Sequence, residues 1–316
     1  MVPTVAVAGA TGGIGRTLVE QILKENKFSV IALTRSENVE SPVSGAQYVQ
    51  VDYEDIPALA KQLETHTVHT VICAIGMLGL DCSEAQIHLI RAAEKAPTVQ
   101  RFVASEWGYH TKEERKNIDP GVDWFLSAAD ILKESRLTYT RPVCGAFMDL
   151  LGTGSPRMKS HIPPMTIAVD VLNREACIPG NGSNTITMIY SYDAATLIAK
   201  LLELDDSEWS EFSFCAGVDT TLSEVLKTAE EVCGEKFKVT YMEPDDVNKG
   251  DVPSMKPLEG SGIQHDEQKE YGSFGYQLYL ADGFNLPTQY RVGDKFPDFK
   301  PTTVREFLSS CWDKKA

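Results

Sequence analysis

Three glycines near the N-terminus have the spacing of a phosphate-binding loop. The stretch "AVAGATGGIGRTLV", residues 6–19, places Gly9, Gly12 and Gly15 between an apolar run and an amphipathic segment. In a strand, turn and helix of this kind, the first glycine permits the tight turn, the second admits a pyrophosphate and the third lets the helix pack on the sheet. The free N–H groups at the start of the helix then face the phosphates. The residues predicted to hold a dinucleotide here are Gly9, Thr11, Gly12, Gly13, Ile14 and Gly15.

The second apolar run ends in a residue that distinguishes the two common dinucleotides. A protein that selects NAD usually has Asp or Glu at this point, to hold the ribose 2′-hydroxyl. This chain has Arg35, whose guanidinium suits a 2′-phosphate. The sequence therefore predicts NADP(H) as the cofactor. Further cofactor contacts are predicted after the third and fourth runs, with Asp52 and Tyr53 at the adenine and Ala74, Ile75 and Gly76 at the nicotinamide ribose.

Apolar runs alternate with amphipathic segments along the first half of the chain. Strands are predicted at 4–9, 29–35, 46–52, 70–76, 101–106 and 137–143, and helices at 13–26, 56–64, 83–96 and 123–135. Strands without polar alternation, separated by helices, are typical of a parallel sheet covered on both faces. The predicted fold class is α/β, a doubly wound parallel Rossmann sheet with a smaller C-terminal α/β substrate lobe. The expected domains are 1–150, with a return segment near 185–204, and 151–316.

The second half has a more mixed pattern. Strands are expected at 174–182 and 185–191, and helices at 191–204, 221–234 and 302–315. Ser191 or Asp193 is the expected cap of the first of these helices, and Thr221 with Glu224 the capping box of the second. Residues 243–277, rich in Gly, Pro and charge, are expected to form a lid or a plain surface loop.

Composition limits the partners of the protein. The formal net charge is −15, which disfavours nucleic acids and anionic membrane surfaces. The longest apolar stretch, 71–80, is too short to cross a bilayer, and no signal peptide is expected. Seven scattered cysteines without a CxxC pair favour reduced thiols and no metal site. A cytoplasmic protein, monomeric or homodimeric, is the expectation.

Several stretches in order along the chain resemble one family. "GATGGIG", Arg35, "RFVASEWG" at 101–108 and "YTRPVCGAFMDLL" at 139–151 are similar to the NmrA-like and isoflavone reductase-like proteins, which are atypical short-chain dehydrogenases. The resemblance continues through "IPGNGSNTITMIYSYDAATLIAKLL" to "KFPDFKPTTVREFL". It implies a Rossmann core with a substrate lobe. The further cofactor residues that it implies are Gln86, Ser105, Glu106, Pro142, Cys144 and Phe147.

The chain departs from this family at a catalytic position. The family's reductases carry a lysine that serves proton transfer, and the corresponding position here is Phe125. Tyr109, His110 and Ser105 are the residues that we expect to serve in its place. An aromatic side chain at this position favours an apolar substrate. The predicted substrate wall consists of Trp107, Phe125, Phe147, Met148, Leu151 and Met165.

Three functions remain open on the sequence. The first is an NADPH-dependent reductase of a hydrophobic small molecule in specialised metabolism, such as an aromatic compound, a conjugated carbonyl or an imine. The second is a non-redox isomerase, cyclase or dehydratase on the same scaffold. The third is an NADP-binding regulatory protein without catalysis, because the family includes such members and a fold does not decide function.

Overall fold

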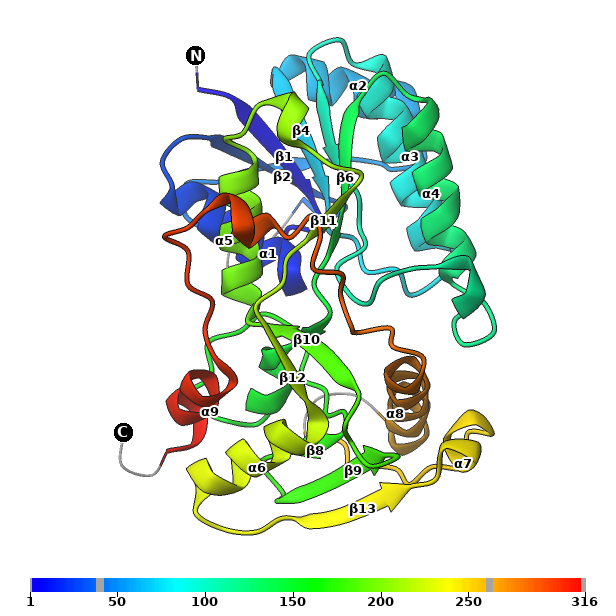
Figure 1. Ribbon diagram of the computed structural model, residues 1–316. Helices are drawn as coiled ribbons and strands as arrows, with labels where there is room; N and C mark the ends of the chain where they lie inside the picture. The colour runs from blue at the N-terminus through cyan, green and yellow to red at the C-terminus, as the bar shows by residue number, and fades with distance from the viewer. Residues whose placement is uncertain (1, 38–42, 260–263, 314–316) are drawn as a thin grey trace.

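Two lobes make up the molecule, and the upper one is built around a single parallel sheet (Figure 1). The computed structural model describes residues 2–37, 43–259 and 264–313. The sheet has the order β11-β6-β5-β4-β1-β2-β3, which confirms the doubly wound fold. Its strands are β1 Thr4–Ala8, β2 Ser29–Thr34, β3 Gln47–Gln50, β4 Val68–Cys73, β5 Arg101–Val103, β6 Thr138–Val143 and β11 Phe212–Phe214.

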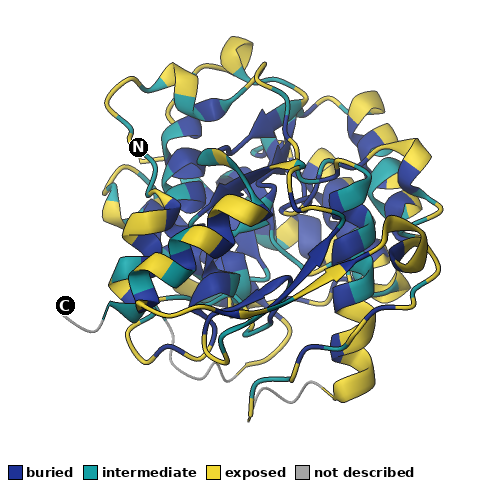
Figure 2. Ribbon diagram, turned by 60° about the horizontal axis from the view of Figure 1, so that its bottom comes forward, coloured by how far each residue is buried: buried dark blue, intermediate teal, exposed yellow. Residues whose placement is uncertain are grey.

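Helices cover both faces of this sheet because successive strand residues point to opposite sides. Val5 and Val7 of β1 pack with α1 Gly13–Lys24 and α5 Ser191–Leu201 on one face. Ala6 and Ala8 pack with the helices of the other face. Those helices are α2 Ile56–Thr65, α3 Leu80–Lys95 and α4 Val122–Glu134. Figure 2 shows the buried strands between helices whose outer surfaces are exposed.

The lower lobe holds two small sheets, with the orders β12-β10-β7 and β13-β9-β8. Their strands are β7 Ala146–Phe147, β8 Val169–Asp170, β9 Glu175–Pro179, β10 Thr185–Ile189, β12 Val218–Thr221 and β13 Lys238–Met242. The helices of this lobe are α6 Leu222–Cys233, α7 Pro244–Asn248, α8 His265–Leu280 and α9 Val304–Trp312. The capping box of Thr221 and Glu224 is confirmed at the start of α6.

Two local expectations were wrong, and one strand was missed. Much of 243–277 is helical, in α7 and α8, whereas a lid or loop was expected. Neither Ser191 nor Asp193 caps α5. The remote carboxylate of Asp149 accepts hydrogen bonds from the Ser191 amide and hydroxyl instead, at 3.0 and 2.7 Å. The strand β11, which adds an edge to the main sheet, was not expected at all.

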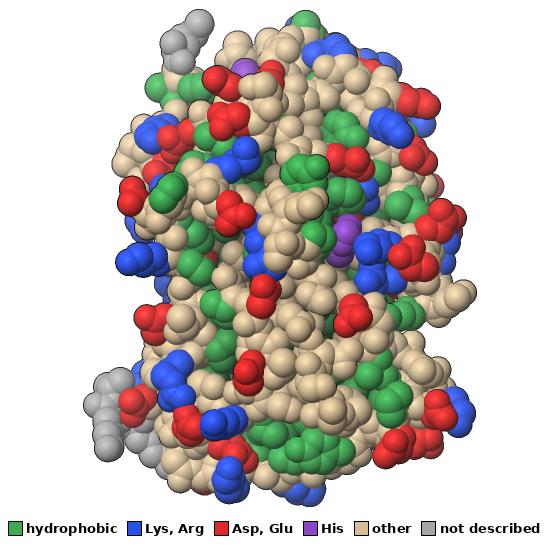
Figure 3. Space-filling model, in the orientation of Figure 1, with side chains coloured by type: hydrophobic (Ala, Val, Ile, Leu, Met, Phe, Trp, Pro, Cys, Tyr) green, Lys and Arg blue, Asp and Glu red, His purple; other side chains and the backbone are tan. Residues whose placement is uncertain are grey.

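The surface carries both signs of charge. Acidic and basic side chains are interspersed over the face shown in Figure 3. None of the helices in the described part of the chain combines the length and the apolar character needed to cross a bilayer.

Candidate cofactor and active site

The glycine loop has the close approaches that its spacing predicts. Gly9 has a φ of +76°, and a Cβ there would lie 2.4 Å from the carbonyl oxygen of Ala74. A Cβ at Gly15 would lie 2.2 Å from the carbonyl oxygen of Gly9. Both positions therefore require glycine. By contrast, a Cβ at Gly12 or Gly13 would meet no atom within 4 Å, so the loop is open on the side where a pyrophosphate would approach.

The start of α1 is suited to an anion. Gly12 is its N-cap and supplies no side-chain hydrogen bond, and the first turn contains no acidic residue. The first N–H groups of a helix have no partner within the helix, and the helix dipole favours negative charge there. Backbone donors beside an open loop fit the diphosphate of a dinucleotide.

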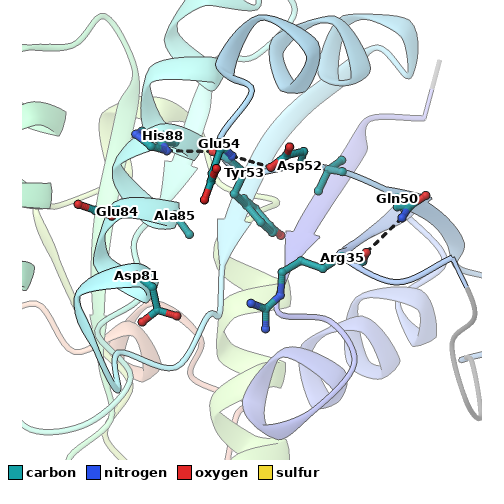
Figure 4. A pocket seen from close by; sticks show the side chains of 10 residues that line it. Arg35, Gln50, Asp52, Tyr53, Glu54, Asp81, Glu84, Ala85 and His88 are labelled. Atoms are coloured by element: carbon teal, nitrogen blue, oxygen red, sulfur yellow. Dashed lines mark hydrogen bonds between the residues drawn. The ribbon is translucent and has the colours of Figure 1, made fainter.

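A cavity of about 820 Å³ lies beyond the loop, at the ends of β2 and β3 (Figure 4). It brings together Arg35, Asp52 and Tyr53, which the sequence predicted as neighbours of the adenosine end. Sequence reasoning placed Gln86 of α3 at the cofactor but missed the residues of this helix that line the cavity, which are Asp81, Glu84, Ala85 and His88. The residues that line the cavity are Arg35, Gln50, Val51, Asp52, Tyr53, Glu54, Asp81, Glu84, Ala85 and His88.

Arg35 supplies the positive charge of this cavity. Among the described residues that line it, Arg35 is the one arginine or lysine, beside four carboxylates. No carboxylate of the described chain lies within 4.0 Å of its guanidinium, and the side chain is exposed. The guanidinium is therefore available to an added anion, and the surrounding carboxylates disfavour anions elsewhere in the cavity.

Ser105 and Gln86 hold the inner end of the site together. The Ser105 amide donates to Gln86 Oε1 at 2.6 Å, and Ser105 Oγ donates to the Ile75 carbonyl oxygen at 2.7 Å. Trp107 Nε1 donates to the Cys73 carbonyl oxygen at 3.0 Å. Because these bonds join the ends of β4, β5 and α3, the three side chains act as supports within the fold.

Glu106 faces the protein interior. Its carboxylate accepts two hydrogen bonds from Arg141, at 2.7 and 3.1 Å, and both side chains are at most 5% exposed. Burial raises the pKa of Glu106, and the Arg141 charge offsets part of that rise. The Glu106 carboxylate is therefore committed to Arg141, and the predicted cofactor contact of Glu106 stays a prediction that concerns its backbone.

Tyr109 and His110 are both engaged within the fold. Tyr109 is 7% exposed, and its hydroxyl donates to Asp119 Oδ2 at 2.5 Å. Burial, followed by the Asp119 carboxylate, raises the pKa of Tyr109. The His110 ring lies 5.1 Å from the rings of both Phe212 and Phe214 on the edge strand β11. Burial and nearby cations lower its pKa to about 4, so it is neutral at pH 7.

The predicted substrate residues divide into two groups. Trp107 and Phe147 pack with the core on the α1 and α5 face of the main sheet, and Phe125, Phe147 and Met165 are partly exposed. Met148 and Leu151 are 0% and 4% exposed and belong to the core of the lower lobe. Their expected place in a substrate wall is wrong, because the short helix Met148–Gly152 turns them toward α9.

The side chains predicted to contact the cofactor at the end of β6 are largely buried. Pro142 lies within β6, and Cys144 is 0% exposed. Burial and the adjacent Cys215 raise the pKa of the Cys144 thiol. Any contact of this segment with a cofactor is therefore left to its backbone and to Phe147.

Comparison with known proteins agrees with this geometry. A family model described as NAD(P)H-binding matches residues 9–159. The curated "Oxidoreductase swnN" of Metarhizium robertsii is 27% identical over 335 residues, covering 98% of each chain. "Isoflavone reductase homolog A622" of Nicotiana tabacum is 23% identical over 324 residues, covering 96% of each.

A solved structure shares the fold over the whole chain. The leucoanthocyanidin reductase–NADPH complex from Vitis vinifera has a TM-score of 0.74 at 18% identity, covering 98% of this chain and 100% of that one. At that identity the likeness shows the fold alone. Together with the named relatives, it confirms the resemblance to the isoflavone reductase-like proteins.

Proposed function

We propose that this protein is an NADPH-dependent reductase of a hydrophobic small molecule in specialised metabolism. The observation that carries the proposal is Arg35, an arginine without an ion pair in the described chain, at the adenosine end of a cavity. The relatives named oxidoreductase and isoflavone reductase homologue support the reaction class. The NADPH-bound plant reductase with this fold supports the choice of cofactor.

The residues present fit NADPH along its length. The backbone of Gly12 and Gly13 would hold the diphosphate, Arg35 the 2′-phosphate, and Asp52 and Tyr53 the adenine side. Ala74, Ile75 and Gly76 at the end of β4 would border the nicotinamide ribose, with Ser105 fixing Ile75. When bound, the cofactor supplies a hydride. The chain supplies a rigid, partly apolar junction around Trp107, Phe125 and Phe147.

The Arg35→Ala variant tests this proposal. Loss of a charge-assisted contact should weaken NADPH binding by about 2 kcal/mol, about 30-fold, and leave NADH binding within twofold. Lys61→Ala removes the same charge from an exposed position on α2 and should leave both affinities unchanged. Calorimetric titration measures the affinities of the wild type and both variants for NADPH and NADH. Equal losses of NADPH and NADH affinity in Arg35→Ala would contradict the assignment.

Turnover separates the reductase from the alternatives. We expect NADPH oxidation, followed at 340 nm, with at least one hydrophobic carbonyl or imine. An isomerase, cyclase or dehydratase would convert substrate without consuming NADPH. A regulator would bind the nucleotide and convert nothing.

A further inference from the structure

An aromatic cluster closes the junction between α4 and α8. The Tyr109 ring lies 6.4 Å from Phe125 of α4 and 6.0 Å from Phe274 of α8, with interplanar angles of 80° and 76°. Phe125 lies in the first turn of α4, at the edge of the sheet where the parallel strands end and ligands bind. Edge-to-face pairs at these distances are packing contacts, and the parts of Phe125 and Phe274 that stay exposed offer aromatic surface, which attracts ammonium groups.

The cluster contains one carboxylate, that of Asp119. Asp119 Oδ2 accepts the Tyr109 hydroxyl at 2.5 Å, and Oδ1 accepts the Gly121 amide at 2.7 Å. No arginine, lysine or histidine nitrogen of the described chain lies within 4.0 Å of it. The nearby Asp123, in contrast, pairs with Lys116 at 2.8 Å. The negative charge of Asp119 is therefore held in place and not paired.

Arg115, a cation of the same loop, is occupied elsewhere. The buried Arg115 guanidinium donates to the carbonyl oxygens of His110, Ala281 and Asp282, at 2.8 to 3.2 Å. It fastens the loop to the end of α8 and leaves the Asp119 carboxylate to its neutral donors. Asp119, Phe125 and Phe274 all keep part of their surface accessible.

We propose that Asp119, Phe125 and Phe274, with the ring of Tyr109, form a receptor for a positively charged nitrogen on the substrate. A fixed carboxylate and aromatic faces both attract a cation electrostatically. They attract a neutral ligand of the same shape much more weakly. The inference rests on the proposed function, of which it names the substrate class: a cationic nitrogen compound such as an N-alkyl iminium.

An iminium substrate is consistent with the state of the predicted proton donors, because each of them is already engaged within the fold. Reduction of an iminium needs a hydride and no proton: a C–H bond forms at carbon, the C=N π pair moves to nitrogen, and a neutral amine results. The positive charge passes to the oxidised cofactor. A ketone would instead need a proton at oxygen, which Tyr109, His110 and Ser105 are not placed to give.

A pair of ligands with one shape and different charge tests the receptor. 4-Hydroxyphenyltrimethylammonium and 4-tert-butylphenol are isosteric, and calorimetry gives their affinities with and without saturating NADP⁺. We expect the cation to bind the wild-type protein at least tenfold more tightly. Asp119→Asn should lower the affinity for the cation about tenfold and leave that for the phenol within twofold. Asp123→Asn is the matched control and should change neither.

A second variant covers the case in which Asp119→Asn does not fold. Phe274→Leu keeps apolar volume and removes the ring, and should lower affinity for the cation about fivefold with the phenol within twofold. Equal affinity for the two ligands, no binding of either, or equal losses in the variants would overturn the receptor. Failure of NADPH to bind, with the receptor intact, would overturn the proposed function alone.

Discussion

The two ends of the site differ in how much of their chemistry the fold uses itself. At the adenosine end, Arg35 is exposed and lines a cavity of about 820 Å³. Around Tyr109, three polar side chains already have partners: Tyr109 bonds Asp119, Ser105 bonds Ile75 and Glu106 pairs with Arg141. At the adenosine end a charged side chain is free for a ligand, whereas around Tyr109 the hydroxyl and carboxylate groups are already bonded within the fold.

The difference between the two ends indicates which parts of a reaction the protein would assist. Because the anion site at Arg35 and the glycine loop is already formed, the protein loses little conformational entropy when a dinucleotide binds there. Proton donors that are committed to the fold contribute little to acid catalysis, which is otherwise worth about 10²–10⁴ in rate. Under the proposed function, the chain binds and positions a hydride donor and its acceptor, and we propose that it supplies no proton.

The largest effect at the cofactor end is expected from two single alanine variants in the glycine loop. Gly15→Ala places a Cβ against the Gly9 carbonyl and should lower the free energy of unfolding by about 3 kcal/mol, as measured by urea denaturation. Gly12→Ala places its Cβ in open space and should leave stability unchanged. Its methyl group should nevertheless weaken NADPH binding about tenfold. Equal destabilisation by both would show that Gly12 is not on an open side.

The corresponding test of the region around Tyr109 is the variant Tyr109→Phe. The variant loses one hydrogen bond to a carboxylate, which should cost about 1 kcal/mol of folding free energy, because water can reach the half-buried Asp119. Its kcat for NADPH oxidation should stay within threefold of the wild type. A fall of a hundredfold or more at unchanged stability would make Tyr109 the proton donor and remove the contrast between the two ends.

The smallest expected effect concerns the contact between the lobes at Glu20 of α1. Its carboxylate accepts hydrogen bonds from Tyr192 and His161, both at 2.7 Å. Burial alone would raise the pKa of Glu20, but these bonds outweigh burial and lower it below 4.5. The stability that they give is therefore present above pH 4.5 and lost as the pH falls through the lower folded pKa.

Urea midpoints between pH 7 and pH 3 measure this effect. The wild type should be more stable than Glu20→Gln at pH 7, and the two should converge toward pH 3. Glu134→Gln, an exposed position on α4, should follow the wild type throughout. A constant difference between wild type and Glu20→Gln at every pH would contradict the titration of this carboxylate.

Local sequence determines much of the fold and of the cofactor site. The parallel sheet follows from apolar runs separated by helices, and Gly15 is required by its contact with Gly9 within one βα unit. Tertiary contacts determine what the sequence could not reveal. Asp149 caps α5 from 42 residues away, and β11 joins the sheet through pairing with β6. The environments of Tyr109 and His110 depend on α8 and β11, which no local pattern connects to them.

The central claim is that this chain holds NADPH through Arg35 and an open glycine loop. Calorimetric titration of the purified protein with NADPH, NADP⁺, NADH and NAD⁺ tests it most directly. We predict a preference for the phosphorylated forms of about 2 kcal/mol, about 30-fold. Equal binding of NADPH and NADH, or no binding of any of the four, would contradict the account.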